Sequence, residues 1–218
     1  MKFDPFGMAN RYLAEELLYK IVRTFMALLL AVFLFHRFSQ YNSFAVKALW
    51  LVETALFTVL LTAYLLRARP VNRSSGLAEI VVPLCGSALP FALLLSPPAQ
   101  QITANGMLFH GLLWGMAAST ALTVWGVWTL RRSFSITVEA RILVTAGPYR
   151  LVRHPVYCGE IFAAAAVAAI RFSLANLSIL LLFIAVQLYR SRLEEGKLLQ
   201  TFPEYRQHLA GSFWFWRL

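Results

Sequence analysis

The chain has 218 residues, of which 59% are hydrophobic and 14% are charged, and its mean hydropathy is +0.63. A soluble core of this size cannot hide so much apolar surface, so the composition excludes a soluble globular protein and predicts an integral membrane protein. The net charge of +10 needs no nucleic-acid partner, because basic loops beside a membrane attract anionic lipid headgroups.

Six apolar stretches follow one another along the chain, at residues 21–38, 44–66, 77–95, 107–130, 156–170 and 174–190. Most of them approach the ~20 residues that a helix needs to cross the hydrocarbon core. The fifth stretch is short and ends at Arg171, so we expect it to pair with the sixth as a helical hairpin. The predicted fold is all-α, a polytopic membrane bundle of about five to six transmembrane helices.

Two features inside these stretches invite interpretation. Gly111 and Gly115 form a small-xxx-small pair in the fourth stretch, and the fifth is almost all alanine from residue 163 to residue 169. We expect both to permit close helix packing. Glu53 falls near the middle of the second stretch, where an ionisable side chain is either functional or paired with a neighbour.

The distribution of basic residues predicts the topology. Seventeen of the 20 lysines and arginines fall on one side of the six stretches, and only Arg37, Lys47 and Arg171 fall on the other. The positive-inside rule therefore predicts that both termini are cytoplasmic. If the source is bacterial, we expect the protein in the inner or plasma membrane. Residues 1–20 are amphipathic without a cleavage site, so we expect them to lie along the interface and not to act as a signal peptide.

Soluble cofactor signatures do not occur in this sequence. None of the eleven glycines forms a G-x-G, no H-E-x-x-H occurs, and Cys85 and Cys158 lie in different stretches. The sequence thus predicts no dinucleotide fingerprint, no P-loop and no metal site. Without an internal repeat or a long linker, residues 1–218 are expected to form one domain.

Two polar clusters flank the predicted hairpin, "AGPYRLVRHPVYCGE" at 146–160 and "YRSRLEEGKLLQTFPEY" at 189–205. If the fifth and sixth stretches pair antiparallel, His154 and Tyr157 face Arg190 and Glu194. Arg190 and Glu194 are separated by four residues and share one helix face. They can address a ligand together, or they can form a solvated ion pair among the headgroups that contributes little.

The segment "RILVTAGPYRLVRHPVYCG" at 141–159, together with "RSRLEE" at 190–195 and "FPEY" at 202–205, resembles the isoprenylcysteine carboxyl methyltransferase family and its phospholipid methyltransferase relatives. The resemblance covers the last ~90 residues, including "RRSFSI" at 131–136. It divides the chain into a variable helical part, 1–130, and a family core, 131–218.

This resemblance implies a membrane enzyme that transfers a methyl group from S-adenosyl-L-methionine, leaving S-adenosyl-L-homocysteine, to a lipophilic or amphiphilic acceptor at the cytosolic face. It also implies a cytosolic cofactor pocket, with Arg190 as the catalytic residue that faces the acceptor. The residues that it places around the methyl donor are Leu143, Val144, Tyr149, His154, Pro155, Val156, Tyr157 and Glu194. No metal is implied.

Methyl transfer is an in-line displacement, in which alignment supplies most of the catalysis. A carboxylate acceptor, as in a prenylcysteine-like compound, needs a cation to hold it, and Arg190 suits that task. A lipid amine must lose a proton, for which Glu194, Glu195 and His154 are the nearby candidates. The family resemblance favours O-methylation, while the residues themselves allow both reactions.

The sequence departs from the family pattern at three places. Arg141 replaces the family's usual histidine, Phe202-Pro203 replaces Phe-Gly, and His208 replaces a second tyrosine. These changes affect the expected rim of the pocket and therefore the identity of the acceptor. Two other classes stay open, a membrane reductase related to sterol reductases, which share the H-P-x-Y region, and a non-catalytic membrane scaffold.

Overall fold

The fold is that of a computed structural model, which describes residues 15–215. The predicted all-α architecture is confirmed, because within these residues the chain forms helices and no strand. Of the interfacial segment predicted for residues 1–20, residues 1–14 lie outside the described part. Residues 15–20 already belong to the first described helix.

Six helices correspond to the six predicted apolar stretches, and at most three residues at either end of a stretch lie outside the corresponding helix. They are α2 (Glu15–Ser39), α3 (Lys47–Leu66), α4 (Ala78–Ala92), α6 (Gly106–Leu130), α7 (Pro155–Ile170) and α8 (Leu174–Thr201). Two short helices, α5 (Gln100–Ala104) and α9 (Tyr205–Gly211), and the 3-10 turns η1 (Tyr41–Ser43), η2 (Leu93–Leu95), η3 (Arg131–Ser133) and η4 (Gly147–Arg150) complete the described elements.

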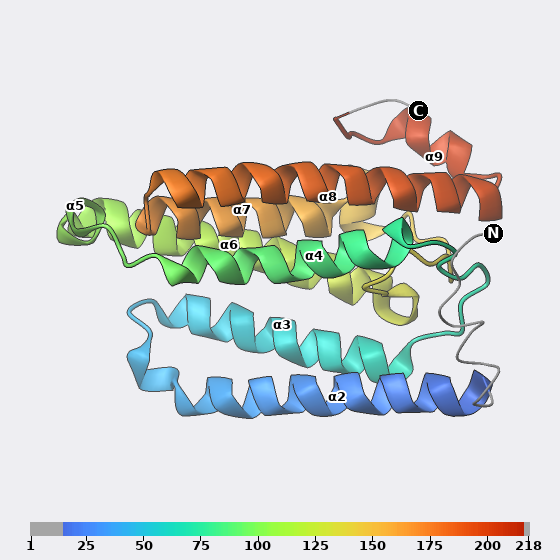
Figure 1. The fold of residues 1–218 in the computed structure, drawn as a ribbon, viewed down its shortest axis with the longest axis horizontal. Helices are drawn as coiled ribbons and strands as arrows, with labels where there is room; N and C mark the ends of the chain where they lie inside the picture. Colours follow the sequence, from blue (N-terminus) through green and yellow to red (C-terminus); the bar gives the residue numbers. More distant parts are fainter. Residues whose placement is uncertain (1–14, 216–218) are drawn as a thin grey trace.

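Five of these helices are long and apolar enough to cross a membrane. The exception is α7, whose 16 residues span about 24 Å, less than the ~30 Å hydrocarbon core. The sequence identified this segment correctly as the weakest span. In contrast, α8 has 28 residues and a length of about 42 Å, so it continues well past the beginning of α7 (Figure 1).

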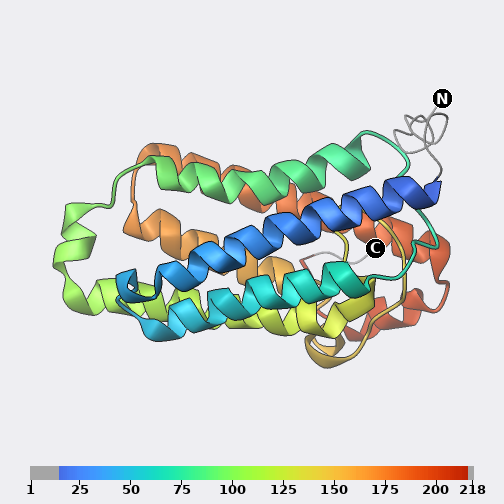
Figure 2. The same ribbon diagram turned by 90° about the horizontal axis from the view of Figure 1, so that it is seen from below.

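The helices lie roughly along one direction, and α2 begins at the same end of the bundle at which α9 lies (Figures 1 and 2). We call this end the cavity end. The α2–α3 pair packs against α6, which in turn packs along α7, while α8 packs mainly against α4. The α7–α8 hairpin is closed at the opposite end, where the Arg171 guanidinium donates to the carbonyls of Leu94 and Ser96.

The closest helix contact is between α6 and α7. A Cβ atom at Gly159 would overlap Oγ1 of Thr123 and lie 2.6 Å from the carbonyl oxygen of Ser119, and one at Gly126 would lie 2.6 Å from Val156. The alanines of α7 contribute as predicted, with Ala164, Ala166 and Ala168 buried. The prediction for Gly111 and Gly115 is wrong, because an added Cβ at either position meets nothing within 4 Å.

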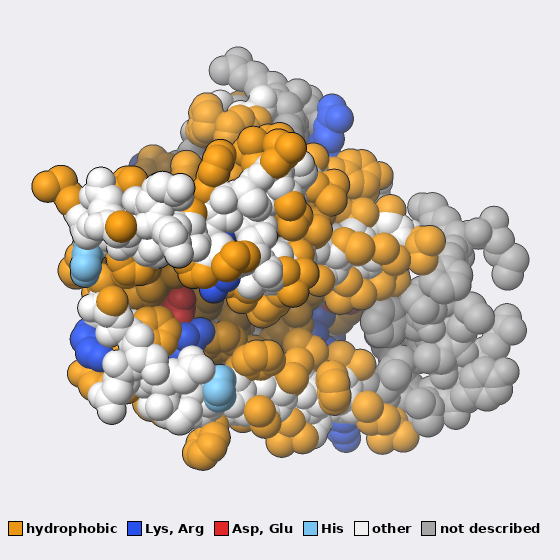
Figure 3. Space-filling model, turned by 60° about the vertical axis from the view of Figure 1, so that its left-hand side comes forward, with side chains coloured by type: hydrophobic (Ala, Val, Ile, Leu, Met, Phe, Trp, Pro, Cys, Tyr) orange, Lys and Arg blue, Asp and Glu red, His pale blue; other side chains and the backbone are white. Residues whose placement is uncertain are grey.

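A deep hollow lined mostly by hydrophobic side chains separates the lower part of the molecule, formed by α2 and α3, from the upper part that carries α4 and α8 (Figure 3). Glu53 is paired with Arg37, with 2.8 Å between Oε2 and Nη1. It lies in the second turn of α3, nearer the end of the helix than the sequence suggested. Of the two interpretations of Glu53, the structure supports the paired carboxyl.

We expect Gly159→Ala to destabilise the protein, because its methyl group overlaps the Ser119 carbonyl, which belongs to the rigid backbone of α6. Overpacking of this kind typically costs about 1–3 kcal/mol. The matched control is Gly115→Ala, which adds the same group where space is open. Thermal unfolding of both variants in detergent should show a lowered midpoint for Gly159→Ala alone, and equal midpoints would contradict the assigned contact.

Candidate active site

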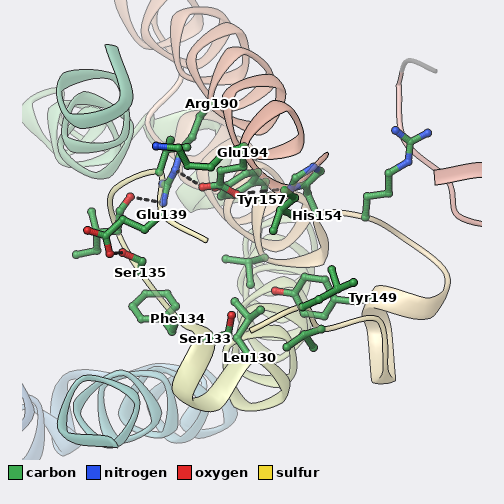
Figure 4. Close-up of a pocket in the computed structure, with 18 of the residues that line it drawn as sticks. Leu130, Ser133, Phe134, Ser135, Glu139, Tyr149, His154, Tyr157, Arg190 and Glu194 are labelled. Atoms are coloured by element: carbon green, nitrogen blue, oxygen red, sulfur yellow. Dashed lines mark hydrogen bonds and ion pairs between the residues drawn. The ribbon is translucent and has the colours of Figure 1, made fainter. Parts of the chain in front are cut away.

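A partly open cavity of about 150 Å³ lies at the cavity end between α4, α7, α8, α9 and the segment that joins α6 to α7. The side chains that line it include Ser87, Leu130, Ser133, Phe134, Ser135, Glu139, Leu143, Val144, Tyr149, Arg153, His154, Val156, Tyr157, Glu160, Arg190, Glu194, Lys197, Tyr205 and His208. Figure 4 shows Phe134, Ser135 and Glu139 facing Tyr157 and Tyr149 across it.

The segment between α6 and α7 folds under local constraints that its sequence explains. Gly147 adopts a positive φ of 57°, a conformation that favours glycine, and an added Cβ would lie 2.9 Å from Oγ1 of Thr129 on α6. Tyr149 follows in the η4 turn and is buried. Pro155 occupies the first turn of α7, where its missing N–H costs nothing. These residues bring His154 and the first turn of α7 to the wall of the cavity.

A fully buried carboxylate, Glu195, holds the beginning of α7 against α8. Its oxygens accept hydrogen bonds from Nη1 of Arg153 at 3.1 and 3.3 Å, and its Oε1 lies 3.0 Å from Nε2 of His154. The His154 ring is stacked on Tyr157, with 5.3 Å between centroids, and it also contacts Trp214. The orientation of both cavity rings therefore depends on Glu195, which itself does not line the cavity.

Tyr157, Arg190 and Glu194 form one polar layer of the cavity wall. The Tyr157 hydroxyl donates to Glu194, and Nε of Arg190 lies 3.3 Å from the same carboxylate oxygen. The Arg190 guanidinium also stands 4.8 Å from the centre of the Tyr157 ring and donates to the carbonyl of Ile136 at 2.8 Å. Only 7% of the Arg190 side chain is exposed, so this is not the solvated surface pair that the sequence also allowed.

Glu160 and Gln187 form a second layer, one helical turn deeper toward the membrane. Glu160 follows Tyr157 by three residues on α7, and Gln187 precedes Arg190 by three residues on α8, so each shares a helix face with its neighbour in the first layer. Gln187 is fully buried, and its Nε2 donates to Oε2 of Glu160. Glu160 itself is partly exposed and lines the cavity.

Two titratable side chains that line the cavity outside the membrane-spanning helices are themselves uncharged at neutral pH. Burial raises the pKa of Tyr149 well above its ordinary value, and the Glu194 carboxylate adds to that effect. Burial, followed by the Arg153 guanidinium, lowers the pKa of His208 below its ordinary 6.5. At pH 7 Tyr149 is therefore a neutral phenol and His208 a neutral imidazole, both suited to hydrogen bonding.

The structure brings Arg190 and seven of the eight residues expected at the donor to this single cavity, namely Leu143, Val144, Tyr149, His154, Val156, Tyr157 and Glu194. Pro155 is the exception. It is fully buried and packs toward Gly126, so it does not line the cavity, and its visible contribution is to begin α7. The predicted meeting of His154 and Tyr157 with Arg190 and Glu194 is confirmed as geometry.

Several cavity residues were missed by sequence reasoning. Glu160 had a signal, because a carboxylate inside the fifth apolar stretch is costly and marks a functional candidate. Phe134 and Ser135 lie in the "RRSFSI" element, which was noted without a role. Lys197, which donates to Glu79 and to the carbonyl of Arg73, had no distinguishing pattern on its own.

The three departures from the family pattern occupy different places. His208 lines the cavity from α9, as expected for the rim. Arg141 does not line the cavity. It is buried and donates to the carbonyl of Ala68 and to Glu139, so it attaches the cavity segment to the chain after α3. Phe202 caps the end of α8, and Pro203 follows in the turn to α9.

A membrane helical bundle with an aromatic and charged cavity at one end is an architecture suited to a polar ligand and a lipophilic one together. Residues 112–200 match the family model described as "Isoprenylcysteine carboxyl methyltransferase (ICMT) family". This match confirms the predicted resemblance for the part of the chain that it covers, and it indicates a membrane methyltransferase. Comparisons with curated proteins and with solved structures gave no match.

Replacing Glu195 by glutamine should destabilise the protein strongly, because Arg153 loses the carboxylate that neutralises it in a site with no exposure. Breaking a buried ion pair from one side typically costs about 3–5 kcal/mol. The control is Glu204→Gln, which makes the same change at an exposed position. Thermal midpoints that fall equally in the two variants would show that Glu195 does not hold this part of the structure.

Proposed function

We propose that the protein is an S-adenosylmethionine-dependent methyltransferase that acts on a lipophilic or amphiphilic acceptor at the cytosolic face of the membrane. The observation that carries the proposal is the convergence of Arg190 with Tyr157, His154 and Glu194 on one cavity, at the end of the bundle where most basic loops lie. We infer that both termini are cytoplasmic, in agreement with the charge distribution.

The chemistry of the cavity residues fits S-adenosylmethionine. Glu194 supplies an anion for the ammonium group of the methyl donor, and 24% of its side chain remains exposed. Leu143, Val144 and Val156 offer apolar surface for the adenine ring, together with the ring of Phe134. Tyr157 and Tyr149 present aromatic faces, and such faces stabilise a sulfonium by roughly 0.5–2 kcal/mol.

S-adenosylmethionine, when bound, would supply an electrophilic methyl group that passes to the acceptor atom as the carbon–sulfur bond breaks and the electron pair stays on sulfur. Arg190 holds the acceptor in line, and its buried guanidinium keeps its charge and its direction through the contacts with Ile136 and Tyr157. A carboxylate acceptor loses no proton, so O-methylation requires only a cation here, and we favour it over N-methylation.

The acceptor is expected to enter from the bilayer between helices. The hollow between the α2–α3 pair and the α4 side supports this route (Figure 3), and Ser87 brings α4 to the cavity wall. The wall expected from the sequence was the second or fourth apolar stretch. Among the residues that line the cavity, the fourth contributes Leu130 and the second contributes none.

Tyr157→Ala should weaken the binding of S-adenosylhomocysteine by at least several-fold, since it removes an aromatic face and the hydroxyl that orients Glu194. His154→Ala should have a similar effect, because the His154 ring supports Tyr157. Titration calorimetry on detergent-purified protein measures both affinities, with Tyr189→Ala on the exposed face of α8 as the control. Two cavity variants that bind like the parent protein would refute the donor site.

Arg190 and Glu194 should fail in different ways. Glu194→Gln removes the anion for the ammonium of the methyl donor, and a charge-assisted hydrogen bond of about 1.5–3 kcal/mol predicts an affinity loss of about tenfold or more. Arg190→Ala should leave that affinity within a few-fold and suppress methyl transfer by about a hundredfold, because the acceptor is no longer aligned.

The two measurements are made separately, donor affinity by titration and transfer with radiolabelled S-adenosylmethionine and S-alkylcysteine acceptors. Equal effects of both substitutions on both quantities would show that the residues act only as a structural ion pair. Lys197→Ala, which removes another buried cation of the cavity wall, separates the specific effect of Arg190 from a general loss of positive charge.

A further inference from the structure

Glu160 is a cavity carboxylate that forms no ion pair within the described residues, and the Arg190 guanidinium acts on it only at longer range. Three carboxylates line the cavity, and two of them are paired, Glu139 with Arg141 and Glu194 with Arg190. Within residues 15–215 no lysine, arginine or histidine nitrogen lies within 4.0 Å of the Glu160 carboxylate. Among the described residues, its one hydrogen-bond donor is the neutral amide of Gln187.

Glu160 lies deep along the bundle, where a carboxylate without an ion-pair partner among the described residues is unfavourable. Gln187, which contacts it, lies about 20 Å along α8 from the end opposite the cavity, within the ~30 Å hydrocarbon core. An ionised carboxylate at such a depth is costly unless a cation or several donors compensate it. Gln187 orients Oε2 of Glu160, while Oε1 has no hydrogen-bond partner among the described residues.

Glu160 lies next to the residues that we propose for methyl transfer. It stands on the face of α7 that carries Tyr157, and Gln187 stands on the face of α8 that carries Arg190. A ligand reaching Arg190 from the membrane side therefore passes the Glu160 carboxylate first. The two side chains present opposite charges in successive layers of one cavity, which is the complement of a headgroup that itself carries opposite charges.

We propose that Glu160 binds a positively charged amine of the acceptor, so that the acceptor is an amphiphile with an ammonium group beside the carboxylate that receives the methyl group. This inference rests on the proposed function and makes Glu160 a specificity-determining residue. Arg190 takes the carboxylate and Glu160 takes the ammonium, which stays bound and unreacted during transfer. Fatty acids and other simple anions lack the second interaction.

Two thioethers with the same tail test the proposal. S-dodecylcysteine carries both charged groups, while its desamino analogue, dodecylthiopropanoic acid, carries the carboxylate alone. In the parent protein kcat/KM for the cysteine compound should exceed that for the analogue by about tenfold or more, the discrimination expected of one charge-assisted interaction. In Glu160→Gln the ratio should fall to about one, chiefly through a higher KM for the cysteine compound.

Two further variants keep the test decisive. Glu160→Asp retains the charge on a shorter side chain and should preserve part of the preference, which a merely structural role would not produce. Glu204→Gln changes an exposed glutamate in the same way as Glu160→Gln and should leave the ratio unchanged. An unchanged ratio in Glu160→Gln would overturn the proposal.

The affinities for S-adenosylmethionine and S-adenosylhomocysteine separate the remaining outcomes. If Glu160→Gln weakens binding of the sulfonium compound and spares the neutral thioether, the carboxylate serves the methyl donor and the proposal fails. If the parent protein binds S-adenosylhomocysteine but neither amphiphile, the proposal alone is overturned. If it binds neither S-adenosylhomocysteine nor the amphiphiles, the proposed function is overturned as well. A base-stable methyl group on nitrogen would also overturn the proposal, because the amine would then be the reacting group.

Discussion

The buried ion cluster of Arg153, His154 and Glu195 is the interaction on which the site depends. Its three members come from the two polar clusters, one at the beginning of α7 and one near the end of α8. If either segment moved, a buried charge would be left without its partner, which is costly. The cluster thereby sets the height at which α7 begins relative to α8. Tyr157 lies one helical turn after His154, and Glu194 is adjacent to Glu195. These two side chains then meet across the cavity.

The short length of α7 explains why a cavity exists at this end of the bundle. α7 and α8 join at the opposite end, and α8 is longer by 12 residues, or about 18 Å. The space beyond the first turn of α7 is filled by the segment from Arg131 to His154 and by α9, which have irregular or short structure. Irregular backbone is tolerated at membrane depth where it lines a cavity, and here it supplies the wall that carries Phe134 and Glu139.

The parts that sequence reasoning predicted are those that depend on chemical type and period. Apolar length gave the helices and singled out α7. The four-residue spacing placed Arg190 and Glu194 on one face, and the antiparallel hairpin set them opposite His154 and Tyr157. Its errors concern surfaces whose partner the sequence does not name. Gly111 and Gly115 satisfy the small-residue pattern, but α7 crosses α6 nearer Gly126 and Gly159, where the approach leaves no room for a side chain.

The same difference separates Glu195 from Glu194, which are adjacent in the sequence and chemically identical. A helix turns by about 100° per residue, so one carboxylate points to the cavity and the other into the protein, where it contacts Arg153 and His154. A pattern of paired glutamates cannot assign these roles, because they follow from the position of α7 relative to α8. The cation that the sequence paired with Glu194 on helical grounds is indeed its neighbour. Arg153 and His154, which contact Glu195, lie about forty residues away in the chain, and only the folded hairpin brings them there.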